Sequence, residues 1–208
     1  MSLIHDISPL LSPRIAVWPG DVGFSREVSL AIDGGDNIDL SAIRTTVHLG
    51  AHTDAPNHYL GGGEGIAARD LDLYFGPCQV ITATVGRGER VRPGDFEVDI
   101  QAPRVLFRTD SYPDPDHFNE DFCSLSPELV MDLAASGVRL IGIDTPSIDP
   151  FSSKDLPTHA AVAKNDMAIL EGVVLTGVPD GVYTLVALPL KLEGADASPV
   201  RAVLIEER

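Results

Sequence analysis

Short apolar segments, separated by proline and glycine, limit the fold of this chain more than any other feature of its sequence. They are rich in Val, Ile and Leu, a composition typical of β-strands. The segments expected to be strands are residues 14–18, 38–49, 78–85, 104–108, 139–143, 183–188 and 200–205. Because helical patterns are fewer, the sequence predicts a protein in which strands outnumber helices.

Two helices are expected in the second half of the chain. The clearer one spans 127–136, because Ser126 is a good N-cap, Pro127 suits the first helical position and Gly137 suits the C-terminal stop. The other spans about 158–168, where small residues favour close packing. Helices that alternate with strands predict an α/β or α+β chain, with a mixed sheet and helices packed against it.

Length and charge restrict the organisation and the partners of the chain. With 208 residues and no long polar stretch, residues 1–208 are expected to form one domain. A net charge of -16 disfavours binding to nucleic acid or to an anionic membrane. The sequence has no signal-like N-terminal segment and no apolar run near the roughly 20 residues of a membrane span, so a soluble, cytoplasmic protein is expected.

Two smaller features are expected to be structural. Cys78 and Cys123 are too few for a disulfide framework and both lie beside apolar residues, so they are expected to be free thiols in the interior. The glycine-rich segment 61–65 lacks the Lys-Ser/Thr pair of a phosphate-binding loop, so a turn is expected there.

The densest group of potential metal ligands is the run His48-Leu-Gly-Ala-His52-Thr-Asp54-Ala-Pro-Asn-His58. Its glycine and proline disfavour a helix, so a strand that ends in an irregular loop is expected. Unrelated histidines are the alternative, but clustered imidazoles and carboxylates gain little unless they bind a metal. Because a metal-bound water is a nucleophile at neutral pH, the run predicts a metal-dependent hydrolase.

The same run resembles a family motif. It matches His-x-Gly-Thr-His-x-Asp-x-Pro-x-His of the cyclase-like metal-dependent hydrolases, except that Ala51 replaces the usual threonine. The resemblance covers nearly the whole chain. Segments 18–21, 143–147, 187–192 and 196–201 are most similar to the kynurenine formamidase (arylformamidase) branch, and isatin hydrolases belong to the same family.

This resemblance implies a swivelling β/β/α fold, a homodimer and two zinc ions per subunit, although manganese, cobalt or iron would also suit such ligands. His58 would be a proton shuttle, whereas spacing alone leaves it as good a ligand as its neighbours. Trp18 would stack on an aromatic substrate, with simple burial as the alternative. The metal ligands implied by the resemblance are His48, His52, Asp54, His159 and Glu171.

The activity implied by the resemblance is hydrolysis of N-formyl-L-kynurenine to L-kynurenine and formate in tryptophan breakdown. An isatin-type cyclic-amide hydrolase and a non-catalytic metal-binding protein are the alternatives. A serine hydrolase is disfavoured, because the sequence contains no Gly-x-Ser-x-Gly motif. His5 and His117 match no part of the motif, and His117 is expected in a surface loop.

Overall fold

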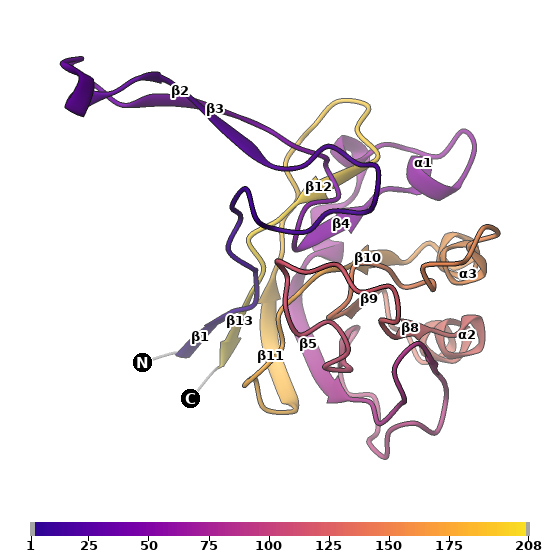
Figure 1. Cartoon of the computed structure of the whole chain (residues 1–208). Helices are drawn as coiled ribbons and strands as arrows, with labels where there is room; N and C mark the ends of the chain where they lie inside the picture. Colours follow the sequence, from indigo (N-terminus) through magenta and orange to yellow (C-terminus); the bar gives the residue numbers. More distant parts are fainter. Residues whose placement is uncertain (1–2, 207–208) are drawn as a thin grey trace.

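A seven-stranded mixed sheet forms the centre of the computed structural model, which describes residues 3–206 (Figure 1). Strands β1, β13, β11 and β5 pair antiparallel, and β5, β7, β9 and β10 pair parallel. In spatial order the strands are β1 (Leu3–Asp6), β13 (Val203–Glu206), β11 (Gly181–Val186), β5 (Phe75–Thr82), β7 (Arg104–Arg108), β9 (Leu140–Ile143) and β10 (Ala168–Leu170). The predicted mixed sheet with packed helices is confirmed.

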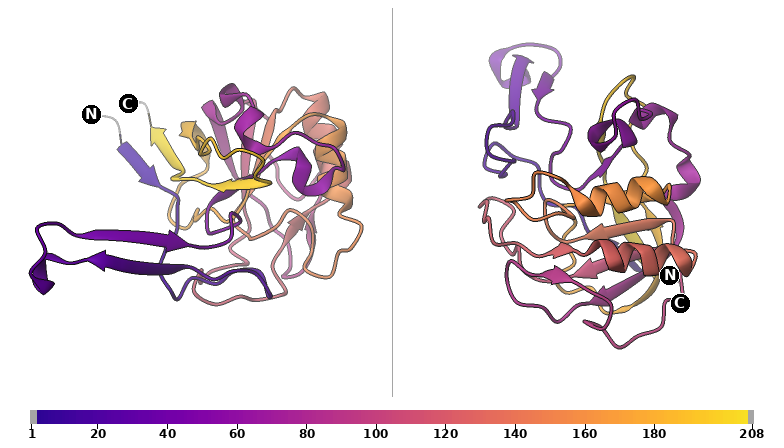
Figure 2. Two further views of the ribbon diagram at one scale, coloured as in Figure 1. Left: turned by 90° about the horizontal axis from the view of Figure 1, so that it is seen from above. Right: turned by 90° about the vertical axis from the view of Figure 1, so that its right-hand side faces the viewer.

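Helices α2 (Pro127–Ala135) and α3 (Pro157–Lys164) lie next to each other on one face of this sheet (Figure 2). The predicted cap of α2 is present, because the Ser126 Oγ atom accepts a hydrogen bond from the Leu129 N–H at 3.1 Å. Gly137 follows the helix with a φ of 86°, in the left-handed region that glycine favours. The buried residues between these helices and the sheet include Val105, Phe107, Leu129, Leu133, Ile141, Ile143 and Val162.

The opposite face of the sheet is covered by loops and by short elements. Side chains alternate along a strand, so Leu106 of β7 packs on this face while Val105 and Phe107 pack under the helices. Burial of both faces explains why the central strands are almost continuously apolar. The covering elements include the antiparallel pair β4 (His52–Asp54) and β12 (Ala197–Pro199), and the single-turn helix α1 (Pro56–Tyr59).

A two-stranded ribbon projects from this body (Figures 1 and 2). It consists of β2 (Ser25–Leu30) and β3 (Leu40–Arg44), with a short 3-10 helix, η1 (Ile32–Gly34), near its tip. None of its residues is buried. Its apolar side chains are therefore in solvent, with exposed fractions from 47% to 65% for Val28, Ile32, Ile38, Leu40 and Ile43.

One predicted strand is absent and several predicted boundaries are wrong, including those of strands 78–85, 183–188 and 200–205, which lie at 75–82, 181–186 and 203–206. Residues 14–18 form turns and no strand, and of the expected strand 38–49 only Leu40–Arg44 is extended and paired. The second helix ends at Lys164 and does not continue to residue 168, because Asp166 adopts a φ of 48° and Ala168 joins β10. Short elements that were not predicted include β6 (Arg90–Val91), β8 (Ser124–Leu125), η2 (Ile66–Ala68) and η3 (Leu71–Leu73).

The predictions for the two cysteines and for the glycine-rich segment agree with the structure. Cys78 and Cys123 are buried and free. The glycine-rich segment 61–65 contains a turn that links α1 to η2. Within residues 3–206, no helix is both long enough and apolar enough to cross a membrane.

Candidate metal centre

Strand β4 carries two of the predicted ligands, His52 and Asp54, and is held from both sides. On one side β12 pairs with it, placing Ala197 opposite Asp54. On the other side, the His52 N–H donates to the Glu171 carbonyl at 3.0 Å, and the Glu171 N–H donates to the His52 carbonyl at 2.9 Å. Because Glu171 directly follows β10, this bridge joins β4 to the edge of the large sheet.

Two glycines allow these segments to approach each other. Gly50 and Gly172 have φ values of 56° and 65°, in the left-handed region. A Cβ atom on Gly172 would lie 2.1 Å from the Gly50 carbonyl oxygen, far inside contact distance. The glycine between the first two histidines of the motif therefore faces a second glycine that adjoins Glu171.

The Asp54 carboxylate is at the centre of the predicted ligands. Its Oδ1 atom lies 3.0 Å from His48 Nδ1 and 3.6 Å from His52 Nε2, and its Oδ2 atom lies 3.5 Å from His159 Nε2. Its side chain is 1% exposed, and neither oxygen has a partner in hydrogen-bonding geometry. A buried carboxylate in that state is costly unless a cation compensates its charge.

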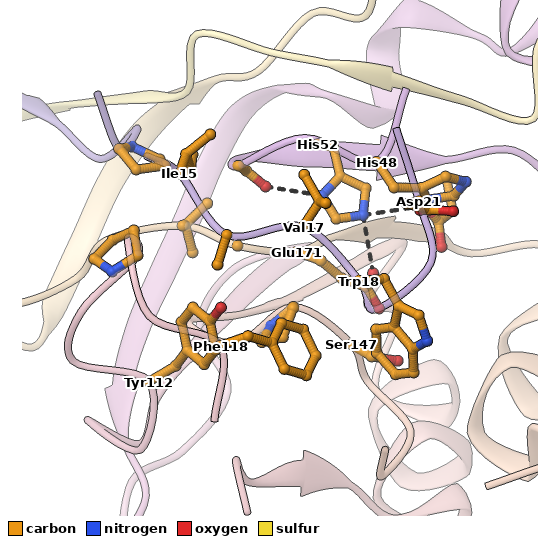
Figure 3. Close-up of a pocket in the computed structure, with 18 of the residues that line it drawn as sticks. Ile15, Val17, Trp18, Asp21, His48, His52, Tyr112, Phe118, Ser147 and Glu171 are labelled. Carbon is orange, nitrogen blue, oxygen red and sulfur yellow. Dashed lines mark hydrogen bonds and ion pairs between the residues drawn. The ribbon is translucent and has the colours of Figure 1, made fainter. Parts of the chain in front are cut away.

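Glu171 completes this group from the edge of the sheet. Its Oε2 atom lies 3.2 Å from His52 Nε2, and its Oε1 atom lies 3.8 Å from His159 Nε2. Figure 3 shows Glu171 and His52 together on one wall of a cavity. Oε1 also accepts a hydrogen bond from the Ile148 N–H at 2.6 Å, which fixes the orientation of the carboxylate.

His48, His52 and His159 each direct one ring nitrogen, the inner one, at the Asp54 carboxylate. The other ring nitrogen of each histidine, the outer one, makes a second contact. His52 Nδ1 lies 2.8 Å from the Gly50 carbonyl oxygen, which can only accept a hydrogen bond. His159 Nδ1 lies 2.9 Å from Asp149 Oδ2, and His48 Nε2 lies 3.0 Å from Asp196 Oδ2. In neutral imidazoles that donate outward, the inner nitrogens carry lone pairs, so these nitrogens and the carboxylate oxygens form a set of donors suited to a metal.

The sequence did not predict the roles of Asp149 and Asp196, the two carboxylates that contact the outer ring nitrogens of His159 and His48. Asp149 is fully buried and also accepts hydrogen bonds from the backbone of Thr158 and His159. Asp196 lies in the C-terminal segment 196–201, which was noted only as a family match. A carboxylate that holds a ligating histidine leaves no spacing pattern, because the contact forms only in the folded chain.

The carboxylates strongly favour positive charge at this site. Burial lowers the pKa of His48, but Asp54, Asp196 and Glu171 together outweigh burial and raise that pKa to about 9. For His159 burial is likewise outweighed by Asp149 and Asp54, which raise the pKa to about 10. Burial raises the pKa of Asp54, yet His159 and His48 hold it well below its usual range. Protons therefore compete with any metal ion for this site.

His58 lies on α1, at the exposed side of the cluster. Its Nδ1 atom lies 3.4 Å from Asp196 Oδ2, and its ring centre lies 4.2 Å from that of His48. Two sets of residues each bring their donor atoms within 4.8 Å of one another, and both sets include Asp54. One set is His48, Asp54 and His58, and the other is His52, Asp54 and Glu171. This arrangement has the chemistry of a divalent metal centre.

A cavity of about 310 Å³ opens above these residues (Figure 3). The candidate metal ligands form one wall, and Trp18, Tyr112 and Phe118 contribute to the other. Trp18 also packs on aromatic neighbours, with ring centres 5.6 Å from Phe118 and 5.1 Å from Phe151. It is thus both a cavity wall and a member of an aromatic cluster. Neither His5 nor His117 lines the cavity, and His117 is in an exposed loop as predicted.

Comparison with known proteins identifies the family. The model of a family described as putative cyclase matches residues 5–150. The chain belongs to this cyclase family. The match includes the whole His48–His58 run, on which the predicted resemblance was based, and that prediction is confirmed.

Individual relatives of the cyclase family agree with this assignment. A kynurenine formamidase from Maricaulis maris (strain MCS10) is 46% identical over 209 residues, covering 99% of each chain. The structure of a predicted metal-dependent hydrolase from Bacillus stearothermophilus matches with a TM-score of 0.84 and 29% identity, covering all of both chains. Isatin hydrolase A from Labrenzia aggregata has a TM-score of 0.84 at 22% identity, covering 100% of this chain and 94% of its own, and it shares the fold.

Proposed function

We propose that this chain is a metal-dependent arylformamidase that hydrolyses N-formyl-L-kynurenine to L-kynurenine and formate in tryptophan breakdown, in the cytoplasm. The observation that carries this proposal is the 46% identity, over 99% of both chains, to the Maricaulis maris kynurenine formamidase. A group of histidines and carboxylates at one wall of an aromatic-lined cavity supports it, because such a cavity suits a substrate with an aromatic ring.

We further propose that the metal is zinc and that two ions bind per subunit. Asp54 and Glu171 would each contact both ions, since each carboxylate has its two oxygens directed at different histidines. When bound, such ions lower the pKa of water and stabilise negative charge on an acyl oxygen. The proposed ligands are His48, His52, Asp54, His159 and Glu171.

His58 would transfer the proton to the departing aryl amine. Its Nδ1 atom is near Asp196, at 3.4 Å, so a hydrogen bond donated to that carboxylate leaves Nε2 free to exchange protons. The side chain is 33% exposed, whereas those of His52 and His159 are 3% exposed, so substrate and water can reach it. Trp18 would pack against the aromatic ring of the substrate.

A homodimer forms part of the proposal. The ribbon of β2 and β3 exposes Val28, Ile32, Ile38, Leu40 and Ile43 close together, and a second copy of the chain could cover this surface. Sedimentation equilibrium of the intact chain, compared with Val28→Asp and Ile43→Asp variants, tests this part. A wild type that remains monomeric at micromolar concentration would contradict it.

Formate release from N-formyl-L-kynurenine, measured together with metal content, tests the activity. The metal-loaded wild type should turn over this substrate much faster than isatin, and no turnover above that of free zinc would refute the assignment. His58→Ala should keep its metal and lose most turnover, whereas Asp54→Ala should lose the metal itself. His117→Ala, a change to an exposed loop, is the matched control and should behave as wild type.

The same variants separate the alternatives. A non-catalytic metal-binding protein would contain metal, hydrolyse nothing and be unaffected by His58→Ala. If His58→Ala and Asp54→Ala lost metal equally, His58 would be a ligand, as its place in one of the two donor sets also permits.

A further inference from the structure

Apart from the proposed metal ligands, the described walls of the cavity contain acidic side chains but no lysine or arginine. Two further carboxylates line it, those of Asp21 and Asp144. Once metal ions neutralise Asp54 and Glu171, these two side chains carry the remaining formal charges of the wall.

Only one of these carboxylates is free to bind a substrate. Asp144 is buried, and its oxygens accept hydrogen bonds from Thr109 N, Thr109 Oγ1 and Asp110 N at 2.6–2.8 Å. It therefore holds the backbone at Thr109 and Asp110. Asp21 is exposed, and its side chain accepts a hydrogen bond at Oδ2 from Thr46 Oγ1 at 3.2 Å, while Oδ1 accepts none from the described residues.

The position of Asp21 relative to the metal centre is fixed through Thr46. The Thr46 hydroxyl also accepts a hydrogen bond from the His48 N–H at 3.3 Å, and the Thr46 N–H donates to the Val22 carbonyl at 2.9 Å. These contacts hold Asp21 beside His48, and Figure 3 shows it close to that histidine at the edge of the cavity. Trp18 lies three residues before Asp21 and lines the same cavity.

We propose that Asp21 recognises a positively charged amino group on the substrate, while the Trp18 side of the cavity receives its aromatic ring. This inference rests on the proposed function and deepens it. N-formyl-L-kynurenine carries an ammonium group and a carboxylate at the end remote from its formamide. The cavity offers a partner for the ammonium group, but its described lining residues include no lysine or arginine for the carboxylate, so it selects cationic or zwitterionic formamides and disfavours anionic ones.

A series of aryl formamides that differ in charge tests this assignment. N-formylkynuramine carries only the ammonium group, 2-formamidoacetophenone is neutral and N-formylanthranilate is anionic. Asp21→Asn should lower kcat/KM about three- to fivefold for N-formylkynuramine and N-formyl-L-kynurenine, the upper part of the range for an exposed ion pair. It should change kcat/KM for the neutral compound less than about twofold. Asp99→Asn, which removes the same charge from an exposed position outside the cavity, should have no selective effect.

Equal losses on the charged and neutral formamides would show that Asp21 is only structural and would overturn the proposal. So would a wild type that prefers N-formylanthranilate to N-formylkynuramine. A binding measurement keeps this test independent of the reaction: kynuramine should bind the metal-loaded wild type more tightly than 2-aminoacetophenone, and Asp21→Asn should remove the difference. If N-formyl-L-kynurenine were not hydrolysed at all, the proposed function would fail, and this binding difference would still decide the role of Asp21.

Discussion

Replacement of Gly172 by alanine should damage both the stability of the fold and its affinity for metal. The new Cβ atom would lie 2.1 Å from the Gly50 carbonyl oxygen, and the residue would keep a φ of 65° that alanine disfavours. The left-handed conformation costs about 1–2 kcal/mol, and relief of the clash by movement of the backbone costs about 1–3 kcal/mol more. Together these reach a substantial part of a typical stability of about 5–15 kcal/mol.

The same movement would displace the carbonyl oxygen of Gly50, which accepts a hydrogen bond from His52 Nδ1. The Gly50 carbonyl holds His52 Nδ1 at 2.8 Å, and loss of such an outer contact typically costs about 10–100-fold in metal affinity. Gly177→Ala is the matched control, because Gly177 has a φ of 81° but an added Cβ would meet nothing within 4 Å. In urea unfolding, Gly177→Ala should therefore lose only about 1–2 kcal/mol of the free energy of unfolding. In competition with a chromophoric chelator, its metal affinity should be that of the wild type. Equal stability and equal metal affinity in the two variants would refute this account of the two glycines.

Two further predictions concern the groups around the cluster. Asp149→Asn should weaken metal binding about 10–100-fold in the same chelator competition, because the carboxylate that orients His159 is lost; unchanged affinity would make Asp149 a structural residue only. In metal-free protein the raised pKa values of His48 and His159, about 9 and 10, stabilise the fold fully below the unfolded value of about 6.5. That contribution to stability is lost as the pH rises through 9 and 10. The thermal unfolding midpoint of chelator-treated protein should therefore decrease as the pH is raised from 6.5 to 10. A midpoint that stays constant over this range would contradict the ion pairs.

Local signals in the sequence predicted those elements whose cause is local. Helix α2 matches its predicted range to within one residue, because its two ends depend on nearby residues: Ser126 caps its start and Gly137 follows its end. The second helix was predicted too long, because its end depends on pairing of Ala168 with Leu140 of β9, a contact between distant segments. Residues 14–18 have the composition of a strand but pair with no strand, and instead the Ala16 N–H donates to the Pro115 carbonyl.

The centre of the site was predictable for a related reason. His48, His52 and Asp54 are neighbours in the sequence, so their shared chemistry is visible there. Assignment of His159 and Glu171 needed the family resemblance, because the fold alone brings these residues to Asp54. Asp149 and Asp196 were missed, since nothing in a sequence marks a carboxylate as the partner of a particular imidazole.

The projecting ribbon has a consequence for how assembly and catalysis are connected. Its two ends meet at the cavity, where the Thr46 N–H bonds to the Val22 carbonyl and Thr46 Oγ1 bonds to Asp21. An isolated two-stranded ribbon is only marginally stable in water, so whatever covers its apolar side chains also sets how firmly it is ordered. Asp21 lies in the loop that leads into β2, and His48 lies in the loop that follows β3. Contacts made at the far end of the ribbon are therefore coupled, through a single hairpin, to the rigidity of the cavity wall.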